Sequence, residues 1–283
     1  MIEVLQPGIH STIQDAGRLK FREQGVAVGG AMDQHAFILA NHLLQHTEIA
    51  PVIEFTIKGP TLYFYAQTFI VLTGAEFHVK LNDKTISHAS PVYIPAESTL
   101  EIGHVKKGNY GYLGVLGGFS TEKVLESGSF HPTLLPSAKL SKGMQLVYIK
   151  THFNNVNFYA RVIPIHDKFC RTKLDVYPGP EFNSLNEEQQ QKLLDTKYFV
   201  VPSSNRMAIQ LGNMPKISAP EIITAPVQPG TVQLTPSGQL IVLMRDAQTT
   251  GGYSRVLQLT DYAMNSLSQC EIGERYEATF HLI

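Results

Sequence analysis

Short runs of β-branched and aromatic residues, separated by turn residues, recur along the whole chain. Runs of this kind predict a mostly β architecture of barrels or sandwiches with few helices. The clearest alternation passes through Tyr276, Ala278, Phe280 and Leu282, and the pair Asn82-Asp83 is typical of a hairpin turn. The expected strands are 2–5, 61–65, 69–73, 77–81, 91–94, 99–102, 110–116, 174–177, 198–201, 208–211, 231–235, 240–244, 256–260 and 275–282.

Three segments have helical patterns instead. Residues 33–46 place apolar side chains on one face at 3.6-residue spacing, with Asp33 as the N-cap. Ser184 and Glu187 form an S-x-x-E pattern that predicts a capping box for a polar helix ending near 195, and a third helix is expected over 261–269.

Three histidines lie on the polar face of the first predicted helix, beside Asn41 and Gln45; they are His35, His42 and His46. Three histidines on one face can bind a metal ion. Because this face lies opposite the apolar stripe, we interpret it as a solvated surface and expect no metal site.

The length of 283 residues predicts two domains of ordinary size. Residues 151–169 show no clear periodicity and are the expected linker. We therefore expect an N-terminal β-barrel-like domain over 1–155 and a C-terminal one over 156–283.

Composition narrows the functional classes. The chain is 43% hydrophobic and 17% charged with a net charge of -1, which does not favour a nucleic-acid partner. No apolar run approaches the roughly 18 residues of a membrane span, and the first residues lack a signal-peptide pattern, so we expect a cytoplasmic protein without membrane attachment. Cys170 and Cys270 belong to no C-x-x-C pair, and we expect reduced, structural thiols.

Glycine-rich segments near both ends of the chain carry the candidate chemistry. They are QPGIHSTIQDAGR (6–18) with GVAVGGAMD (25–33), and RDAQTTGGY (245–253). Glycine lets the backbone approach a ligand closely, and the polar residues beside it need partners. We interpret these segments as walls of a pocket.

In the first segment, Gln14, Asp15 and Arg18 offer an amide, a general base and an anion clamp. Alternatively, Asp15 and Arg18 pair to fix a loop. Gly29 and Gly30 lead into a helix N-terminus, which favours a bound carboxylate or phosphate, although a tight turn followed by an N-cap explains them equally well.

Further candidates lie elsewhere in the chain. Glu54 is an isolated carboxylate before an apolar–polar stretch, where such a residue is usually solvated or bonded to a turn. The turn at 203–207 offers hydroxyls, an amide and a guanidinium for oxyanion recognition, with loop scaffolding as the alternative. The C-terminal segment is the strongest candidate because of its density of polar groups. The residues concerned are Asn205, Arg206, Asp246, Gln248, Thr249 and Gly251.

The sequence contains no GxxxxGK[ST] loop, no GxSxG elbow and no HExxH pair. The residues alone therefore indicate a polar pocket for a small anionic or amide-bearing molecule.

An ordered series of motifs resembles a known family. The motifs are the segments quoted above together with EFTIKGPTL (54–62), LTGAEF (72–77), LGVLGGF (113–119), PGPE (178–181) and SSNRMAIQL (203–211). They resemble the family of 5-oxoprolinase C subunits, also called allophanate hydrolase subunit 2 or biotin-dependent carboxyltransferase. That family is similar to part of the carboxyltransferase region of urea carboxylase.

The resemblance implies two cyclophilin-like β-barrel domains. It also implies an assembly with a kinase-inhibitor-like B subunit and an A subunit, which uses ATP and water to open 5-oxo-L-proline to L-glutamate. On matching motifs, it implies catalytic roles for Asp15, Asp33 and Asp246. The implied substrate-binding residues are Gln14, Arg18, Gly29, Gly30, Glu54, Asn205, Arg206, Gln248, Thr249 and Gly251.

The chain departs from the family pattern at three places. The family's Ser-Arg-Ser-like segment is Ser127-Gly128-Ser129 here, Ala247 stands where relatives often have arginine, and Ser254 replaces a usual proline. Loss of cations from an anion pocket bears directly on the substrate. Two alternatives stay open: a carboxyltransferase moving CO2 from carboxybiotin to a urea-like amide, and a non-catalytic regulator of a kinase-inhibitor partner.

Overall fold

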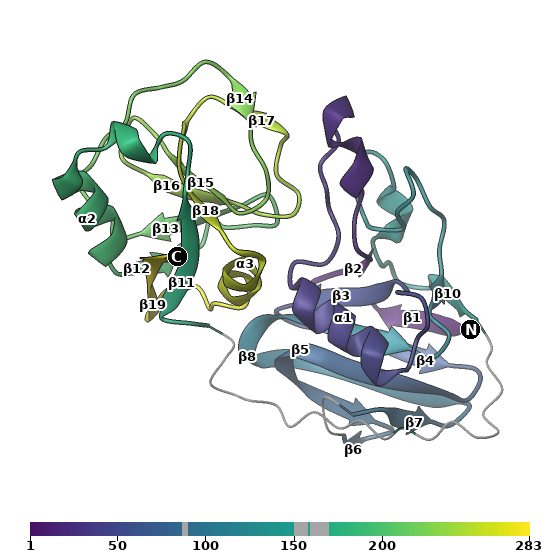
Figure 1. The fold of residues 1–283 in the computed structure, drawn as a ribbon. Coiled ribbons are helices and arrows are strands. Elements are labelled where there is room, and N and C mark those ends of the chain that lie inside the picture. Colours follow the sequence, from purple (N-terminus) through teal and green to yellow (C-terminus); the bar gives the residue numbers. More distant parts are fainter. Residues whose placement is uncertain (87–89, 150–157, 159–169) are drawn as a thin grey trace. The chain divides into compact units, whose positions relative to one another are not determined.

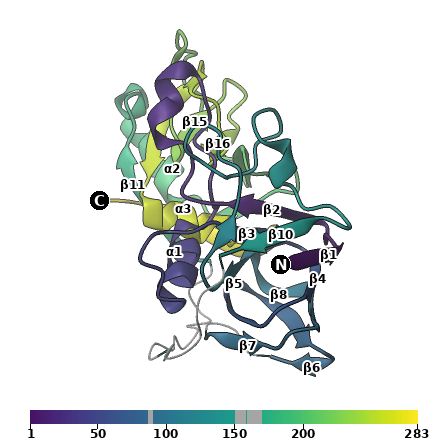
Figure 2. The ribbon, with the colours of Figure 1, turned by 90° about the vertical axis from the view of Figure 1, so that its right-hand side faces the viewer.

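The computed structural model describes residues 1–86, 90–149, 158 and 170–283 (Figures 1 and 2). The chain divides into two compact units. Unit 1 comprises Met1–Gly17 and Gly29–Asp167, and unit 2 comprises Arg18–Val28 and Lys168–Ile283. A segment of the N-terminal half thus belongs to the second unit. The domain boundary expected at 155–156 and the linker expected over 151–169 lie, apart from residue 158, outside the described residues and stay predictions.

Unit 1 is built on one curled antiparallel sheet, a half-barrel. Its two longest strands pair along their length, and register shifts between Gly74 and Val79 let the pair bend. The strands are β1 (Ile2–Gln6), β2 (His10–Gln14), β3 (Val52–Thr56), β4 (Thr61–Phe64), β5 (Thr68–Leu81), β6 (Lys84–Thr85), β7 (Val92–Ile94), β8 (Ser98–Val115), β9 (Phe119–Ser120) and β10 (Gln145–Tyr148). The order is β2-β3-β8-β4-β1-β10-β9, and β5 pairs with β6, β7 and β8.

Helix α1 (Gln34–Leu43) packs against β5 and β8 of this sheet (Figure 1). The Thr73 hydroxyl donates a hydrogen bond of 2.7 Å to the Ala36 carbonyl. A Cβ atom at Gly114 would lie 2.9 Å from Leu44 Cδ1, so glycine permits the close approach of the helix. Thr73 and Gly114 meet the helix, whereas their strand neighbours Leu72 and Leu113 belong to the main core of the sheet. Because successive side chains of a strand point to opposite faces, α1 covers the face of the sheet opposite that core.

Unit 2 contains a closed seven-stranded barrel. Parallel pairing of the first and last strands, with Leu174 opposite Phe280, closes it. The barrel order is β11 (Lys173–Pro178), β18 (Ser254–Leu259), β15 (Thr231–Leu234), β16 (Leu240–Leu243), β13 (Ala208–Gly212), β12 (Tyr198–Val200) and β19 (Gly273–Leu282). A two-stranded ribbon of β14 (Ala225–Pro226) and β17 (Thr250–Gly251) also belongs to this unit, as do the helices α2 (Glu187–Asp195) and α3 (Asp261–Ser268). The 3-10 turns η1 (Leu19–Gln24) and η4 (Phe182–Ser184) lie in unit 2, and η2 (Pro136–Ala138) lies in unit 1.

The prediction of a mostly β protein with few short helices is confirmed. Asp33 caps α1 as predicted, with its side chain accepting from the Ala36 N–H at 3.0 Å. The predicted Ser184–Glu187 capping box is wrong, because the Ser184 hydroxyl donates instead to the Glu181 carbonyl. Asn186 and Gln189 form the box that begins α2.

The histidine face is only partly solvated. His35 and His42 are exposed, but α1 ends at Leu43 and His46 folds back onto Asn41, with 2.8 Å between Nδ1 and Oδ1. Asn41 is 1% exposed, and burial lowers the pKa of His46 below its usual value while the Val115 carbonyl opposes that shift. Nowhere in the described ranges do three or more His, Cys, Asp or Glu side chains gather in a way that could hold a metal ion. Those ranges also contain no helix that is long and apolar enough to cross a membrane.

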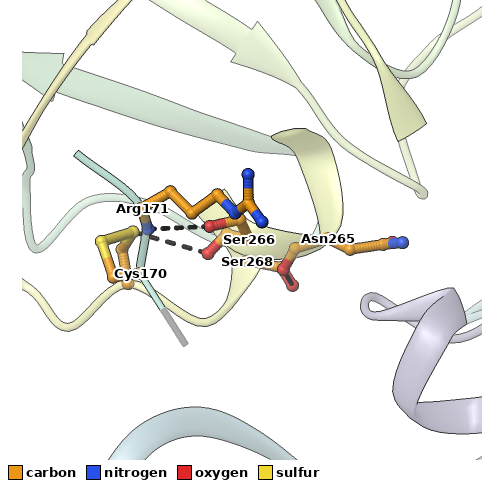
Figure 3. The surroundings of a disulfide bond; sticks show 6 residues. Cys170, Arg171, Asn265, Ser266 and Ser268 are labelled. Atoms are coloured by element: carbon orange, nitrogen blue, oxygen red, sulfur yellow. Dashed lines mark hydrogen bonds between the residues drawn. A yellow bond between two sulfur atoms is a disulfide. The ribbon is translucent and has the colours of Figure 1, made fainter. Parts of the chain in front are cut away.

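The expectation of reduced thiols is wrong in this structure, where Cys170 and Cys270 form a disulfide (Figure 3). The end of α3 brings Cys270 to within 4.8 Å of Cys170, measured between Cα atoms, although 100 positions separate them in the sequence. The Arg171 N–H donates to Ser266 Oγ at 2.9 Å, and the Arg171 guanidinium lies 3.9 Å from the Tyr262 ring centroid. Sequence spacing cannot reveal this approach, because the fold creates it.

Candidate functional site

Asp15 is the acceptor at the centre of a hydrogen-bond network in unit 1. Its Oδ1 accepts from the Gly17 N–H at 2.8 Å, from Ser127 Oγ at 2.6 Å and from Ser129 Oγ at 2.5 Å. Its Oδ2 accepts from the Gly128 N–H at 2.7 Å. The Asp15 N–H in turn donates to Ser129 Oγ at 2.9 Å. The carboxylate thereby ties the loop after β2 to the segment 127–129.

This geometry gives Asp15 a structural role. Two hydroxyls and two backbone N–H groups donate to this carboxylate, three of them to Oδ1 and one to Oδ2. These contacts explain the carboxylate at position 15 without requiring it to act as a general base. The predicted catalytic role of Asp15 stays a prediction.

The Gly29-Gly30 turn packs directly on the Asp15 loop. Both glycines have positive φ angles, 67° and 82°, and a Cβ atom on Gly30 would lie 2.9 Å from backbone atoms of residues 15–17. The Ala31 N–H donates to the Asp15 carbonyl at 3.0 Å. Only glycine fits at position 30, which explains the motif by close backbone packing.

Glu54 lies at the N-terminus of α1, where an external anion was expected. Its Oε2 accepts from the Met32 N–H at 2.7 Å and from the Tyr112 hydroxyl at 2.9 Å, and the same hydroxyl accepts from the Asp33 N–H at 2.7 Å. Glu54 is 1% exposed, so the expectation of a solvated or turn-bonded residue is wrong about its exposure. Burial, Glu54 and Asp33 together hold the pKa of Tyr112 well above its usual value. The protein's own carboxylate thus uses part of the positive end of α1.

Gln14 is fully buried at the end of β2. Its Nε2 donates to Thr12 Oγ1 at 3.0 Å, whereas its Oε1 has no hydrogen-bond partner in the described part of the chain. A buried carbonyl oxygen without a donor is costly, and native structures contain few of them. Gln14 therefore remains a candidate for contact with a ligand.

Arg18 belongs to unit 2, although its motif neighbours Gln14 and Asp15 belong to unit 1. Its side chain is 1% exposed, and its N–H donates to the Val28 carbonyl at 2.6 Å. That bond closes the base of the excursion formed by Arg18–Val28.

Arg206 and Asp246 form a bidentate ion pair in unit 2. Nε donates to Oδ2 at 2.8 Å and Nη2 donates to Oδ1 at 2.9 Å, while the Asp246 N–H donates to the Arg206 carbonyl at 3.0 Å. Arg206 is 9% exposed. Asn205 Oδ1 accepts from the N–H groups of Met207 and Ala208, so this amide shapes the turn. The pair joins two motifs that lie far apart in the sequence.

The rest of the C-terminal segment includes exposed polar side chains. Gln248 and Thr250 are exposed, and Thr249 accepts from the Val227 N–H through its carbonyl at 3.0 Å. A Cβ atom on Gly251 would lie 2.6 Å from Gln233 Nε2, so the glycine accommodates a buried amide. The side chains of Gln248 and Thr249 form no hydrogen bond within the described ranges and are accessible to a ligand.

A pocket lies beside this segment in unit 2, with a volume of about 300 Å³. Glu181 of the PGPE motif and Arg255 form a bidentate pair at its edge, at 2.7 and 2.9 Å. Their contact lowers the pKa of Glu181 and raises that of Arg255. Arg22 and Gln228 also line the pocket.

The structure brings the predicted residues together in two groups. Gln14, Asp15, Gly29, Gly30, Asp33 and Glu54 lie in unit 1; Arg18, Asn205, Arg206, Asp246, Gln248, Thr249 and Gly251 lie in unit 2. Sequence reasoning missed Tyr112 as the partner of Glu54, and Ser127 and Ser129 as partners of Asp15, because a serine or tyrosine gives no signal when its contact is distant in sequence. It also assigned no role to three charged residues at the pocket of unit 2, which are Arg22, Glu181 and Arg255.

Comparison with known proteins places this geometry in context. The C subunit of 5-oxoprolinase from Haemophilus influenzae is 32% identical over 286 residues, which cover 98% of this chain and 91% of that protein. The urea amidolyase of Saccharomyces cerevisiae is 29% identical over 231 residues, which cover 76% of this chain and 12% of that protein. The solved structure of TTHA0988 superimposes with a TM-score of 0.88 at 26% identity; the match covers 99% of this chain and 56% of that one.

A family model provides the broadest match. The model of the carboxyltransferase domain, subdomain A and B, matches residues 24–280, which include segments of both units. The match and the near full-length relative agree with the motif series found in the sequence. The chain therefore belongs to the carboxyltransferase domain family, subdomain A and B.

Proposed function

We propose that this chain is the C subunit of an ATP-dependent 5-oxoprolinase that converts 5-oxo-L-proline to L-glutamate. The observation that carries the proposal is the alignment with the 5-oxoprolinase C subunit of Haemophilus influenzae, which spans 98% of this chain and 91% of that protein. The alignment leaves only a small part of either protein unmatched. In contrast, the match to urea amidolyase involves only 12% of that protein.

The proposed reaction needs activation of a stable amide. Transfer of the γ-phosphoryl group of ATP to the lactam oxygen gives ADP and an activated ring carbon. Water adds to that carbon, the C–N bond breaks and the ring nitrogen takes up a proton, which leaves an acyl phosphate. A second water then hydrolyses the acyl phosphate to the carboxylate of glutamate and inorganic phosphate. Such a site requires cations for the phosphoryl group and an acceptor for the proton of water.

Both groups of candidate residues contain side chains with the hydrogen-bonding or charged groups that such a site requires. Arg206, held by Asp246, provides a fixed guanidinium, and Gln248 with Thr249 provides accessible hydrogen-bonding groups. In unit 1, Gln14 provides a buried oxygen with bonding capacity to spare. Within each unit we propose these residues for substrate contact, with Asp33 as the candidate acid–base group of unit 1 and Asp246 as that of unit 2.

ATP is a substrate of the assembly in this proposal. The sequence contains no GxxxxGK[ST] loop, so we assign the phosphates to the A or B subunit and expect this chain to be inactive alone. The kinase-inhibitor-like B subunit is the proposed direct partner, and the cytoplasmic location expected from the sequence stays a prediction.

One alternative has its own support. The matched family model is that of a carboxyltransferase, and urea amidolyase is among the relatives. A carboxyltransferase would require a biotin carrier from another chain or domain. The regulatory alternative rests on the motif departures alone.

The test is reconstitution of the three-component assembly. We would co-express this chain with the A and B subunits and measure glutamate release from 5-oxo-L-proline with and without ATP. Asp246→Asn removes the charge that holds Arg206, whereas Asp261→Asn removes an 89% exposed carboxylate as the matched control.

We expect turnover that requires ATP and this chain, is lost in Asp246→Asn and persists in Asp261→Asn. A stable three-component complex without turnover would contradict the proposal. Carboxylation of urea by the same preparation, once supplied with a carboxybiotin carrier, would support the alternative.

A further inference from the structure

The pocket of about 300 Å³ in unit 2 has features that the proposed function does not use; we call it the Arg22 pocket. Pro178–Pro180 of the PGPE motif form part of its lining, and Pro226, Val227 and Gln228 form another part. Residues 225–227 are hydrogen-bonded to residues 249–251 of the C-terminal segment. Ala225 lies opposite Gly251, and the Val227 N–H donates to the Thr249 carbonyl. The pocket therefore lies directly beside the C-terminal motif.

Arg22 reaches the pocket from the excursion Arg18–Val28. One Nη2 N–H donates to the Val227 carbonyl. Throughout the described ranges this is the sole hydrogen bond of its guanidinium, and no carboxylate forms an ion pair with it. A guanidinium has several further N–H donors, and a partly buried cation is normally paired. Arg22 thus brings an uncompensated positive charge to the pocket.

The second cation of the pocket is already neutralised. Arg255 donates through Nε and Nη2 to both oxygens of Glu181, and through Nη1 to the Pro226 carbonyl at 2.9 Å. Thr231 and Gln258 bond to each other at 2.9 Å. By contrast, the Gln228 amide is exposed and has no side-chain bond in the described part of the chain. The groups left for a ligand are one guanidinium and one amide.

We propose that the Arg22 pocket binds a small carboxylate, with the Arg22 guanidinium on its oxygens and Gln228 on a neighbouring polar group. The volume lies at the lower end of the range of about 300–1,000 Å³ for ligand pockets, which suits a compact molecule. Proline and aliphatic side chains supply an apolar wall for a small ring. Only the choice of 5-oxo-L-proline as the ligand rests on the proposed function; carboxylate binding does not.

The test is an NMR titration of the complete isotope-labelled chain, read at the amides of Gly179 and Gln228. The probes are 5-oxo-L-proline, acetate and pyrrolidin-2-one, an uncharged lactam of the same ring size. Arg22→Gln removes the charge, Arg22→Lys keeps it without the planar fork, and Lys20→Gln is the matched control, because Lys20 is exposed on the same turn and does not line the pocket.

We expect both carboxylates, and not pyrrolidin-2-one, to shift the two amides. Affinity for the carboxylates should fall at least about tenfold in Arg22→Gln, less in Arg22→Lys and not at all in Lys20→Gln. Equal shifts with pyrrolidin-2-one, or no shift with either carboxylate in the unmodified chain, overturn the inference without any variant having to fold. Failure of the proposed function would look different: carboxylates would bind, but the reconstituted complex would not release glutamate.

Discussion

The Asp15 network makes a quantitative prediction about the stability of unit 1. Asp15→Ala removes the acceptor of the backbone N–H groups of Gly17 and Gly128 and of the hydroxyls of Ser127 and Ser129. A backbone N–H cannot turn away, and leaving one unsatisfied costs about 1–3 kcal/mol, whereas a hydroxyl can rotate to another acceptor. Because bonds to one group are not additive, we expect a loss of about 3–4 kcal/mol, a large part of a typical domain stability of about 5–15 kcal/mol.

Two measurements check this prediction. Urea unfolding gives the loss of stability, and hydrogen exchange at the Gly128 amide gives the local effect, since that N–H donates to Asp15 Oδ2. Glu122→Ala, which removes an exposed carboxylate from the neighbouring loop, should change stability by less than about 0.5 kcal/mol.

The result also separates the structural role from the catalytic one. If Asp15 acted only as a general base, Asp15→Ala would unfold like the parent chain, retain slow exchange at Gly128 and lose activity in the reconstituted complex. A loss below about 1 kcal/mol with unchanged exchange would refute the network argument.

Three further predictions concern other contacts. Gly128→Ala should destabilise by about 1–3 kcal/mol, because its Cβ would lie 2.5 Å from Thr121 Oγ1, and Thr121→Ala should restore most of this loss in thermal unfolding; an additive double variant would contradict the steric argument. The pKa of Glu181 is lowered below 4.5 in the folded state, so its stabilisation is present above that value and is lost as pH falls through the lowered pKa. Glu181→Gln should reduce the fall of the melting temperature between about pH 5 and 3. An unchanged dependence on pH would count against a stabilising role of the ion pair. Reduction of the Cys170–Cys270 disulfide should cost about 2–4 kcal/mol in urea unfolding, with no effect of the reductant on Cys270→Ser.

The sequence predicted regular elements well where a local rule determines them. Asp33 caps α1, and the Asn82-Asp83 turn, with φ angles of 45° and 68°, joins β5 to β6. Strands β2 and β3 were missed because they do not alternate: Ser11, Thr12 and Gln14 of β2 are all buried. Burial on both faces removes the period on which the prediction depends.

The candidate site was predicted by residue type but not by contact. The motif series pointed to Arg206 and Asp246, and their bidentate pairing depends on a register between strands that no local pattern specifies. The alternative for Glu54, a solvated or turn-bonded carboxylate, is wrong about its exposure, because nothing near it in sequence indicates Tyr112, its partner 58 positions away. The disulfide was missed for the same reason, since its two cysteines meet only through the tertiary fold.

The excursion Arg18–Val28 limits how this protein can be divided. A fragment that begins at Lys168 would contain every barrel strand of unit 2 and would still lack the guanidinium of Arg22. During synthesis, residues 18–28 leave the ribosome early and must wait for Val227 before they acquire their contact. A gene cut between the two units would therefore leave Arg22 on the N-terminal fragment and separate it from the carbonyl that holds it.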